Sequence, residues 1–107
     1  MSESLQSLQP QGRLDATNSG ILEKQALDSI DSGSRRLLID FAGLQYISSA
    51  GLRTVLVVAK RMKAAGGQLA LCSMNPQIAE VFKVSGFDAI LDIYASADVA
   101  KAKLSAG

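Results

Sequence analysis

The sequence predicts an α/β domain with a mainly parallel central sheet of about four strands, flanked by about four helices. Three observations favour this class. Apolar runs of strand length alternate along the chain with longer stretches whose apolar residues recur at helical spacing. The run Leu37–Ile39 is continuously apolar, which is typical of a strand covered by helices on both faces. The 107 residues match the usual size of one domain, which can bury a core without disulfides or metals.

The first half of the chain is expected to contain a helix and a strand. Residues 1–11 are rich in Ser and Gln and have room for one strand at most, so they form either an edge strand or a loose tail. Several N-cap candidates lie in Asp15–Ser19, and apolar residues at helical spacing predict a helix over about 18–31. A strand is predicted over 36–41, and we expect Ala42–Ile47 to be a loop with apolar anchors.

The middle of the chain has the strongest helical pattern. A helix opens at Ser48–Gly51 and is stopped by Gly66-Gly67, with basic residues in its last turns. Its inward stripe is expected to comprise Leu52, Val55, Leu56, Ala59 and Met62.

Two more strands and two more helices are predicted towards the C-terminus. After a short strand over 68–73, Asn75 is expected to cap a helix that has Pro76 at its first position. A last strand over 90–94 and a final helix capped by Ser96 complete the alternation. The side chains expected to face inward from the Asn75-capped helix are Ile78, Val81 and Phe82, and those of the final helix are Val99, Ala100 and Leu104.

The composition argues against several classes of function. Without any histidine, the chain lacks the commonest general base and the commonest metal ligand, so we expect no catalytic residue, metal or cofactor. The net charge of +1 gives no reason to expect nucleic acid as a partner. No apolar run is long enough to span a membrane, and the first residues lack the pattern of a signal peptide. Because Cys72 is the single cysteine, nothing requires an oxidising compartment, and we expect a cytoplasmic protein.

Four segments together point to one family. They are Gly12–Asp15, the strand end Leu38–Phe41, the helix start Tyr46–Leu52, and Val84–Phe87 with the strand that follows. In their order and spacing they resemble an anti-sigma factor antagonist of the STAS family. The resemblance implies a STAS-like single domain over residues 1–107 that binds other proteins and is not an enzyme.

The resemblance also implies a phosphorylation site. Family members have the pattern Asp-Ser-Ser/Thr-Gly-Leu at this helix start, and the serine after the aspartate is phosphorylated by a serine kinase that is also the anti-sigma factor. Gly51 and Leu52 match the Gly-Leu of this pattern, so Ser49 falls on the modified position. Ser48 stands in place of the aspartate and Ala50 in place of the second hydroxyl residue. Ser48 is the second candidate. The physical alternative is that one serine simply caps the helix, although a helix N-terminus also favours an anion.

A partner-binding surface is expected around this helix start. It comprises Asp15, Ser48, Ser49, Arg53, Val57 and Lys60. Val57 is either an ordinary surface valine or an apolar anchor between basic residues. Asp15 is either the N-cap of the first helix or part of the partner surface.

Two functions remain open from the sequence. In the first, the chain is a phosphorylation-regulated switch that binds a serine-kinase anti-sigma factor, controls sigma factor release and transcription, and is reset by a serine phosphatase. In the second, it is a STAS domain that senses a small ligand or serves as a scaffold component without an active phosphoswitch.

Overall fold

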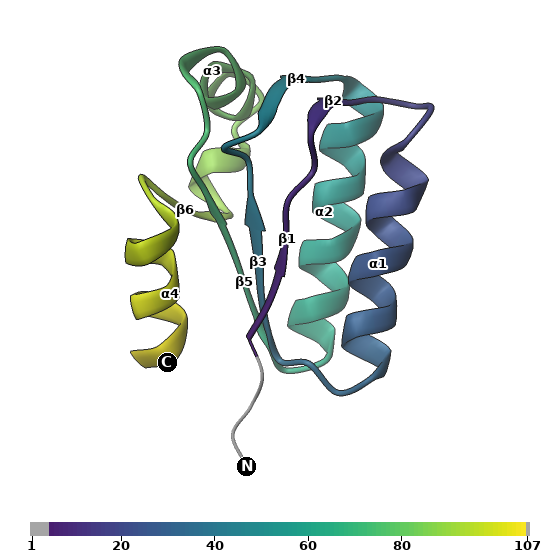
Figure 1. Cartoon of the computed structure of the whole chain (residues 1–107), viewed down its shortest axis with the longest axis vertical. Coiled ribbons are helices and arrows are strands. Elements are labelled where there is room, and N and C mark those ends of the chain that lie inside the picture. The colour runs from purple at the N-terminus through teal and green to yellow at the C-terminus, as the bar shows by residue number, and fades with distance from the viewer. Residues whose placement is uncertain (1–4, 107) are drawn as a thin grey trace.

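A parallel sheet forms the centre of the computed structural model, which describes residues 5–106 (Figure 1). Its strands follow the order β1-β3-β5-β6, and each neighbouring pair is parallel. They span Leu5–Leu8 (β1), Arg36–Asp40 (β3), Gln68–Cys72 (β5) and Asp92–Tyr94 (β6). Four helices accompany this sheet within the described residues, so the predicted fold class is confirmed.

The N-terminal segment contributes an edge strand. β1 pairs with β3 from Leu5 opposite Arg36 to Leu8 opposite Ile39, and it has no other neighbour in the sheet. The part of the predicted segment formed by residues 1–4 lies outside the described residues.

Helices cover both faces of the sheet. α1 (Ser19–Asp31) and α2 (Ser49–Ala64) lie side by side on one face, and α4 (Ala97–Ala106) lies on the other (Figure 1). α3 (Pro76–Val84) stands at the carboxyl end of the strands and leads into a 3-10 helix (Phe87–Ala89). The carboxyl ends of β3 and β5 therefore point towards the same end of the molecule as α3.

The apolar run of β3 is buried on both sides, as its pattern predicts. Leu37 lies in a cluster with Val58 and Met62 of α2, whereas Leu38 lies with Ala100 and Leu104 of α4. Burying one such side chain contributes roughly 1.5–3 kcal/mol relative to leaving it in water. The alternation of side chains along a strand thus joins both helical layers to one sheet.

The predicted loop at Ala42–Ile47 is wrong in its second half. Leu44–Ile47 forms strand β4, which pairs in parallel with β2 (Gly12–Leu14) as a separate two-stranded sheet. Leu44 and Ile47 are buried in the main core while the two residues between them are exposed. A ladder this short depends on a partner about 30 residues away, which local sequence pattern does not reveal.

The inward face of α2 is rotated from the predicted stripe. Thr54 and Val58 are buried together with the expected Val55 and Met62. By contrast, Leu52, Leu56 and Ala59 are only partly buried. The rotation follows from the first turn of the helix, where Gly51 has to face β2, as described below.

The remaining elements differ little from prediction. Asn75 caps α3 by accepting a hydrogen bond from the Ile78 amide at 2.8 Å, with Pro76 next in the chain. Val81 of α3 is exposed rather than inward, because the helix contributes only Ile78 and Phe82 to the core.

The last strand begins later than predicted, and the last helix buries fewer of the expected apolar side chains. β6 begins at Asp92, because the 3-10 helix ends at Ala89 and the turn that follows it leaves Ile90 in solvent. The Ser96 hydroxyl accepts from the Val99 amide at 3.2 Å and so caps α4 as predicted, but the Val99 side chain is exposed.

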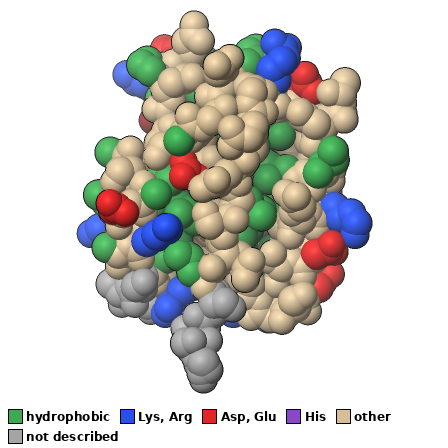
Figure 2. All heavy atoms as spheres, in the orientation of Figure 1, with side chains coloured by type: hydrophobic (Ala, Val, Ile, Leu, Met, Phe, Trp, Pro, Cys, Tyr) green, Lys and Arg blue, Asp and Glu red, His purple; other side chains and the backbone are tan. Residues whose placement is uncertain are grey.

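The surface carries both signs of charge. On the face shown in Figure 2, acidic and basic side chains are interspersed and do not form an extended patch of either sign. None of the helices in the described part of the chain is long and apolar enough to cross a membrane.

Candidate functional site

The start of α2 is tied to the end of β2. The Ser48 amide donates to the carbonyl oxygen of Leu14 at 2.9 Å, and the Ser48 hydroxyl accepts from the Gly51 amide at 3.2 Å. The Leu52 amide donates to the Ser48 carbonyl at 2.9 Å and starts the helical ladder. Ser48 is therefore the N-cap, and Ser49 is the first residue of the helix.

Gly51 allows this close approach. A Cβ atom at this position would lie 2.6 Å from the Leu14 carbonyl oxygen and 2.9 Å from Cγ1 of Ile47. Both distances are shorter than van der Waals contact, so the first turn of α2 rests on β2 and β4 only because residue 51 has no side chain. The family resemblance marked Gly51, and the structure supplies the physical reason.

The two candidate serines differ in their surroundings. Ser48 is partly buried and its hydroxyl is engaged as the cap, whereas Ser49 is exposed. The first turn of α2 contains no acidic residue. Because the first amides of a helix point towards its N-terminus, a phosphate on Ser49 would meet a favourable electrostatic environment.

Asp15 does not cap α1. Its carboxylate accepts hydrogen bonds from the Thr17 hydroxyl at 2.6 Å and the Thr17 amide at 3.0 Å, and Arg13 Nε lies 3.4 Å away. The N-cap position belongs to Asn18, whose side chain instead bonds the backbone of Asp15 and Arg13. The hydrogen bonds from Thr17 lower the pKa of Asp15, so its carboxylate keeps a negative charge one residue beyond the end of β2.

An aromatic contact near the helix start was missed by the sequence analysis. The guanidinium carbon of Arg13 lies 4.4 Å from the centre of the Tyr46 ring, and the two residues are partners in the β2–β4 ladder. Such a cation–π contact holds the exposed Tyr46 in place and contributes about 0.5–1 kcal/mol at an exposed site. Since the pairing of β2 with β4 was not predicted, no sequence signal joined Arg13 to Tyr46.

Four predicted residues form one line on the outer side of α2. Ser49, Arg53, Val57 and Lys60 follow one another at intervals of four, four and three residues, which places them on one side of a helix. We call them the α2 ridge. Arg53 and Lys60 are exposed, and Val57 is partly buried without belonging to the buried core. The structure therefore brings these four predicted residues together along the helix.

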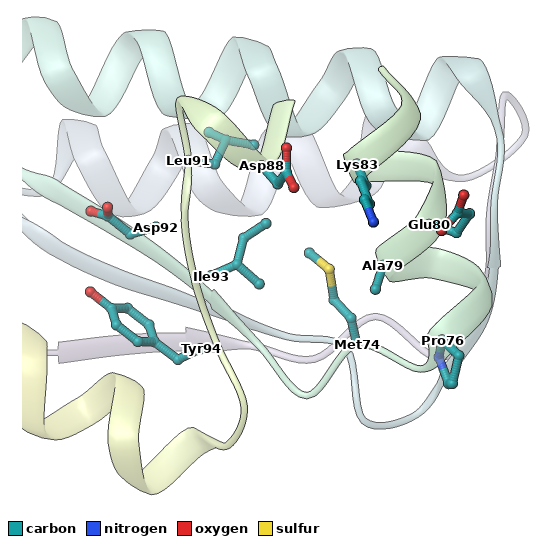
Figure 3. A pocket seen from close by; sticks show the side chains of 10 residues that line it. All are labelled: Met74, Pro76, Ala79, Glu80, Lys83, Asp88, Leu91, Asp92, Ile93 and Tyr94. Atoms are coloured by element: carbon teal, nitrogen blue, oxygen red, sulfur yellow. The ribbon is translucent and has the colours of Figure 1, made fainter. Parts of the chain in front are cut away.

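Two hollows flank α3. The first, of about 530 Å³, lies between α3, the 3-10 helix and β6; Met74 and Ile93 point into it and charged side chains surround it (Figure 3). The second, of about 550 Å³, lies between α3 and β4 and is mostly apolar. Neither contains a residue of the α2 ridge. Across the described residues, no group of three or more His, Cys, Asp or Glu side chains could hold a metal ion.

Sequence comparison places the chain among known proteins. The sequence model of the STAS domain matches residues 3–100. BtrV of Bordetella bronchiseptica, which is provisionally assigned as an anti-sigma factor antagonist, is 42% identical over 92 residues. The aligned region covers 86% of this chain and 79% of BtrV.

Structural comparison agrees. A crystal structure from Thermotoga maritima, of a protein provisionally assigned to the same class, superposes with a TM-score of 0.89 at 22% identity and covers 94% of this chain and 87% of that one. The Bacillus cell fate determinant SpoIIAA in its phosphorylated form superposes with a TM-score of 0.75 at 20% identity, over 95% and 92% of the two chains. At these identities the superpositions establish the common fold.

Proposed function

The chain belongs to the STAS domain family, and we propose that it acts as an anti-sigma factor antagonist whose affinity for its partner is set by phosphorylation of Ser49. The partner is an anti-sigma factor with serine-kinase activity. Binding of the unmodified chain to that kinase leaves the sigma factor available for transcription, and a serine phosphatase resets the phosphorylated chain. Under this proposal the chain is cytoplasmic, performs no chemistry of its own and needs no cofactor.

One observation supports the proposal above all others. Ser48 caps α2, while Ser49 is exposed at the first helical position, where a kinase has access to its hydroxyl. Ser49 is also the position that corresponds to the modified serine in the family pattern. The name of BtrV and the phosphorylated form of SpoIIAA point the same way for relatives of the chain.

The α2 ridge explains how a phosphate would weaken binding. Phosphorylation adds about −1.5 to −2 charges at the end of the ridge. If the partner covers Ser49, that charge has to be desolvated. A partner surface that is complementary to Arg53 and Lys60 is acidic, so it would also repel the phosphate. The fold itself tolerates the phosphate because the group lies at a helix N-terminus.

A ligand-sensing or scaffold role is the second candidate. The observation in its favour is that Ser48 stands where the family pattern has aspartate, and the structure uses its hydroxyl for capping. A domain of this kind would not be phosphorylated by a partner kinase.

Phosphopeptide mapping tests the proposal. The kinase is isolated by pull-down from the native cell with the unmodified chain as bait, and the chain is then incubated with this kinase and ATP. We expect one phosphate on Ser49, no modification of Ser49→Ala, and continued modification of Ser48→Ala. Phosphate only on Ser48, or full phosphorylation of Ser49→Ala, would contradict the assignment.

A further inference from the structure

The hollow between β4 and α3 is a surface groove with apolar walls. Tyr46 and Ile47 line it from β4, and Ile78 and Val81 line it from α3. We call it the β4–α3 groove. Tyr46 is 45% exposed and Val81 is 37% exposed, so two large apolar side chains of the groove are in contact with water. Neighbouring exposed apolar side chains of this kind mark interaction sites.

Both walls of the groove are held in position before any partner arrives. The Asn75 side chain donates from Nδ2 to the Leu44 carbonyl of β4 at 3.3 Å, and its Oδ1 caps α3. One residue thus fixes the helix to the strand across the groove. On the other wall, Arg13 lies over the Tyr46 ring. A preformed groove avoids part of the cost of ordering side chains during binding.

We propose that the β4–α3 groove receives an apolar side chain of the same anti-sigma factor that recognises the α2 ridge. This inference rests on the proposed function. Ile47 lines the groove and is followed in the chain by Ser48 and Ser49. The groove therefore adjoins the start of α2, so one continuous partner surface can cover both.

The charges around the start of α2 constrain the partner surface. Arg53 and Lys60 make the α2 ridge positive. The groove carries both signs, because Glu80 lines it from α3 and the exposed Arg13 lies over Tyr46 on the β4 wall. The complementary partner surface therefore has acidic residues facing α2 and an apolar side chain entering the groove.

A protein side chain suits the groove better than a small molecule does. Binding pockets for small ligands bury 70–90% or more of the ligand surface. Here the walls themselves are partly exposed at Tyr46 and Val81, so a small ligand would stay in contact with water. A partner surface that continues over Ser49 closes the groove from above.

Two substitutions on one helix test the inference. Val81→Asp places a charge in the groove, and Val84→Asp places the same charge three residues further on α3, where the side chain is 76% exposed and outside the groove. Affinity for the isolated kinase in the presence of ADP is measured by calorimetric titration. We expect at least a tenfold loss for Val81→Asp and less than a twofold change for Val84→Asp. Gln77→Trp, which adds bulk at an exposed position of the groove, is expected to cause a loss similar to that of Val81→Asp.

The outcomes separate this inference from the proposed function. If the kinase phosphorylates Ser49 but binds Val81→Asp and Gln77→Trp as tightly as the wild-type chain, the inference alone is overturned. If it neither binds the wild-type chain nor phosphorylates Ser49, the proposed function fails and the inference fails with it. A small apolar molecule detected by native mass spectrometry on the wild-type chain, and lost in Gln77→Trp, would also overturn the inference.

Discussion

Gly51 is the residue on which the geometry of the helix start depends. Its Cα lies against the Leu14 carbonyl, the same oxygen that accepts the Ser48 amide. The end of β2 is thereby fixed next to the serine that caps α2.

Replacing Gly51 with alanine is expected to destabilise the fold. The added Cβ would lie 2.6 Å from a backbone oxygen that cannot move alone, so β2 or the helix start has to shift. Overpacking of this kind costs about 1–3 kcal/mol. For a domain of this size, thermal unfolding should show a melting temperature lower by about 4–8 °C per kcal/mol.

Gly20 provides the matched control for this experiment. It lies in the first turn of α1, and a Cβ there would meet nothing within 4 Å. Gly20→Ala should leave the melting temperature unchanged or raise it, because alanine is the better helix former. Equal melting temperatures for Gly51→Ala and the wild-type chain would show that the close approach is not required.

At the scale of elements, α2 has two distinct sides. Its inward side is set by Gly51, Val55, Val58 and Met62, and its outward side presents the α2 ridge. Because the buried face is fixed by the contact with β2, the ridge is fixed as well. A predicted phosphosite and a predicted docking surface are thus parts of one rigid helix.

Val57→Asp tests the ridge. If Val57 is an apolar anchor, a charge at its centre should weaken kinase binding more than tenfold, since losses at such anchors reach about 2 kcal/mol or more. Ala59→Asp is the control, because residue 59 is also partly buried in α2 but points away from the ridge. Calorimetric titration of both variants, after thermal melts establish equal folding, gives the comparison. Unchanged affinity for a folded Val57→Asp variant would return Val57 to an ordinary surface position.

At the scale of the whole molecule, the two faces of the sheet are unequally covered. One face is covered by two long helices, whereas on the other the described side chains of α4 contribute Ala100 and Leu104 to the buried cluster. Cys72 of β5 lies fully buried in that cluster, and burial raises the pKa of its thiol. Burial therefore disfavours the reactive thiolate, and we expect alkylating reagents to reach the sulfur only when α4 moves away from the sheet.

Alkylation of Cys72 should measure this opening. We expect the opening that exposes the thiol to cost less free energy than global unfolding, because α4 should be able to leave the sheet while the opposite face stays intact. Leu104→Ala removes the larger of the two described side chains that α4 buries, and it should accelerate labelling at least tenfold, since such truncations cost about 2–5 kcal/mol.

Val99→Ala is the control on the same helix, because its side chain is exposed. It should label at the wild-type rate. The free energy of global unfolding is measured separately by denaturant titration. If exposing Cys72 in the wild-type chain costs that full free energy, α4 and the sheet form one cooperative unit and the prediction is wrong.

The site could be predicted only where its signals are local. The caps at Asn75 and Ser96 follow from the preference of short polar side chains for helix starts, and each caps its helix in the structure. At the start of α2 the sequence favoured a serine cap without choosing between two serines, and the structure assigns it to Ser48. Ser49 falls at a helix start for the same reason. The partner surface itself stays a prediction, because the structure shows where its residues lie and not what they bind.

By itself, the sequence determined the α/β class, the helix starts and the buried central strand, because periodicity and capping act between residues a few positions apart. Only the tertiary structure decided the pairing of β2 with β4, the rotation of α2 about Gly51 and the groove between β4 and α3. Each of these depends on contacts between distant segments, such as the hydrogen bond from Asn75 to Leu44 across 31 residues. Such contacts form only when the folded chain brings two distant segments together. A local sequence pattern therefore does not reveal which distant backbone group a glycine or an asparagine will contact.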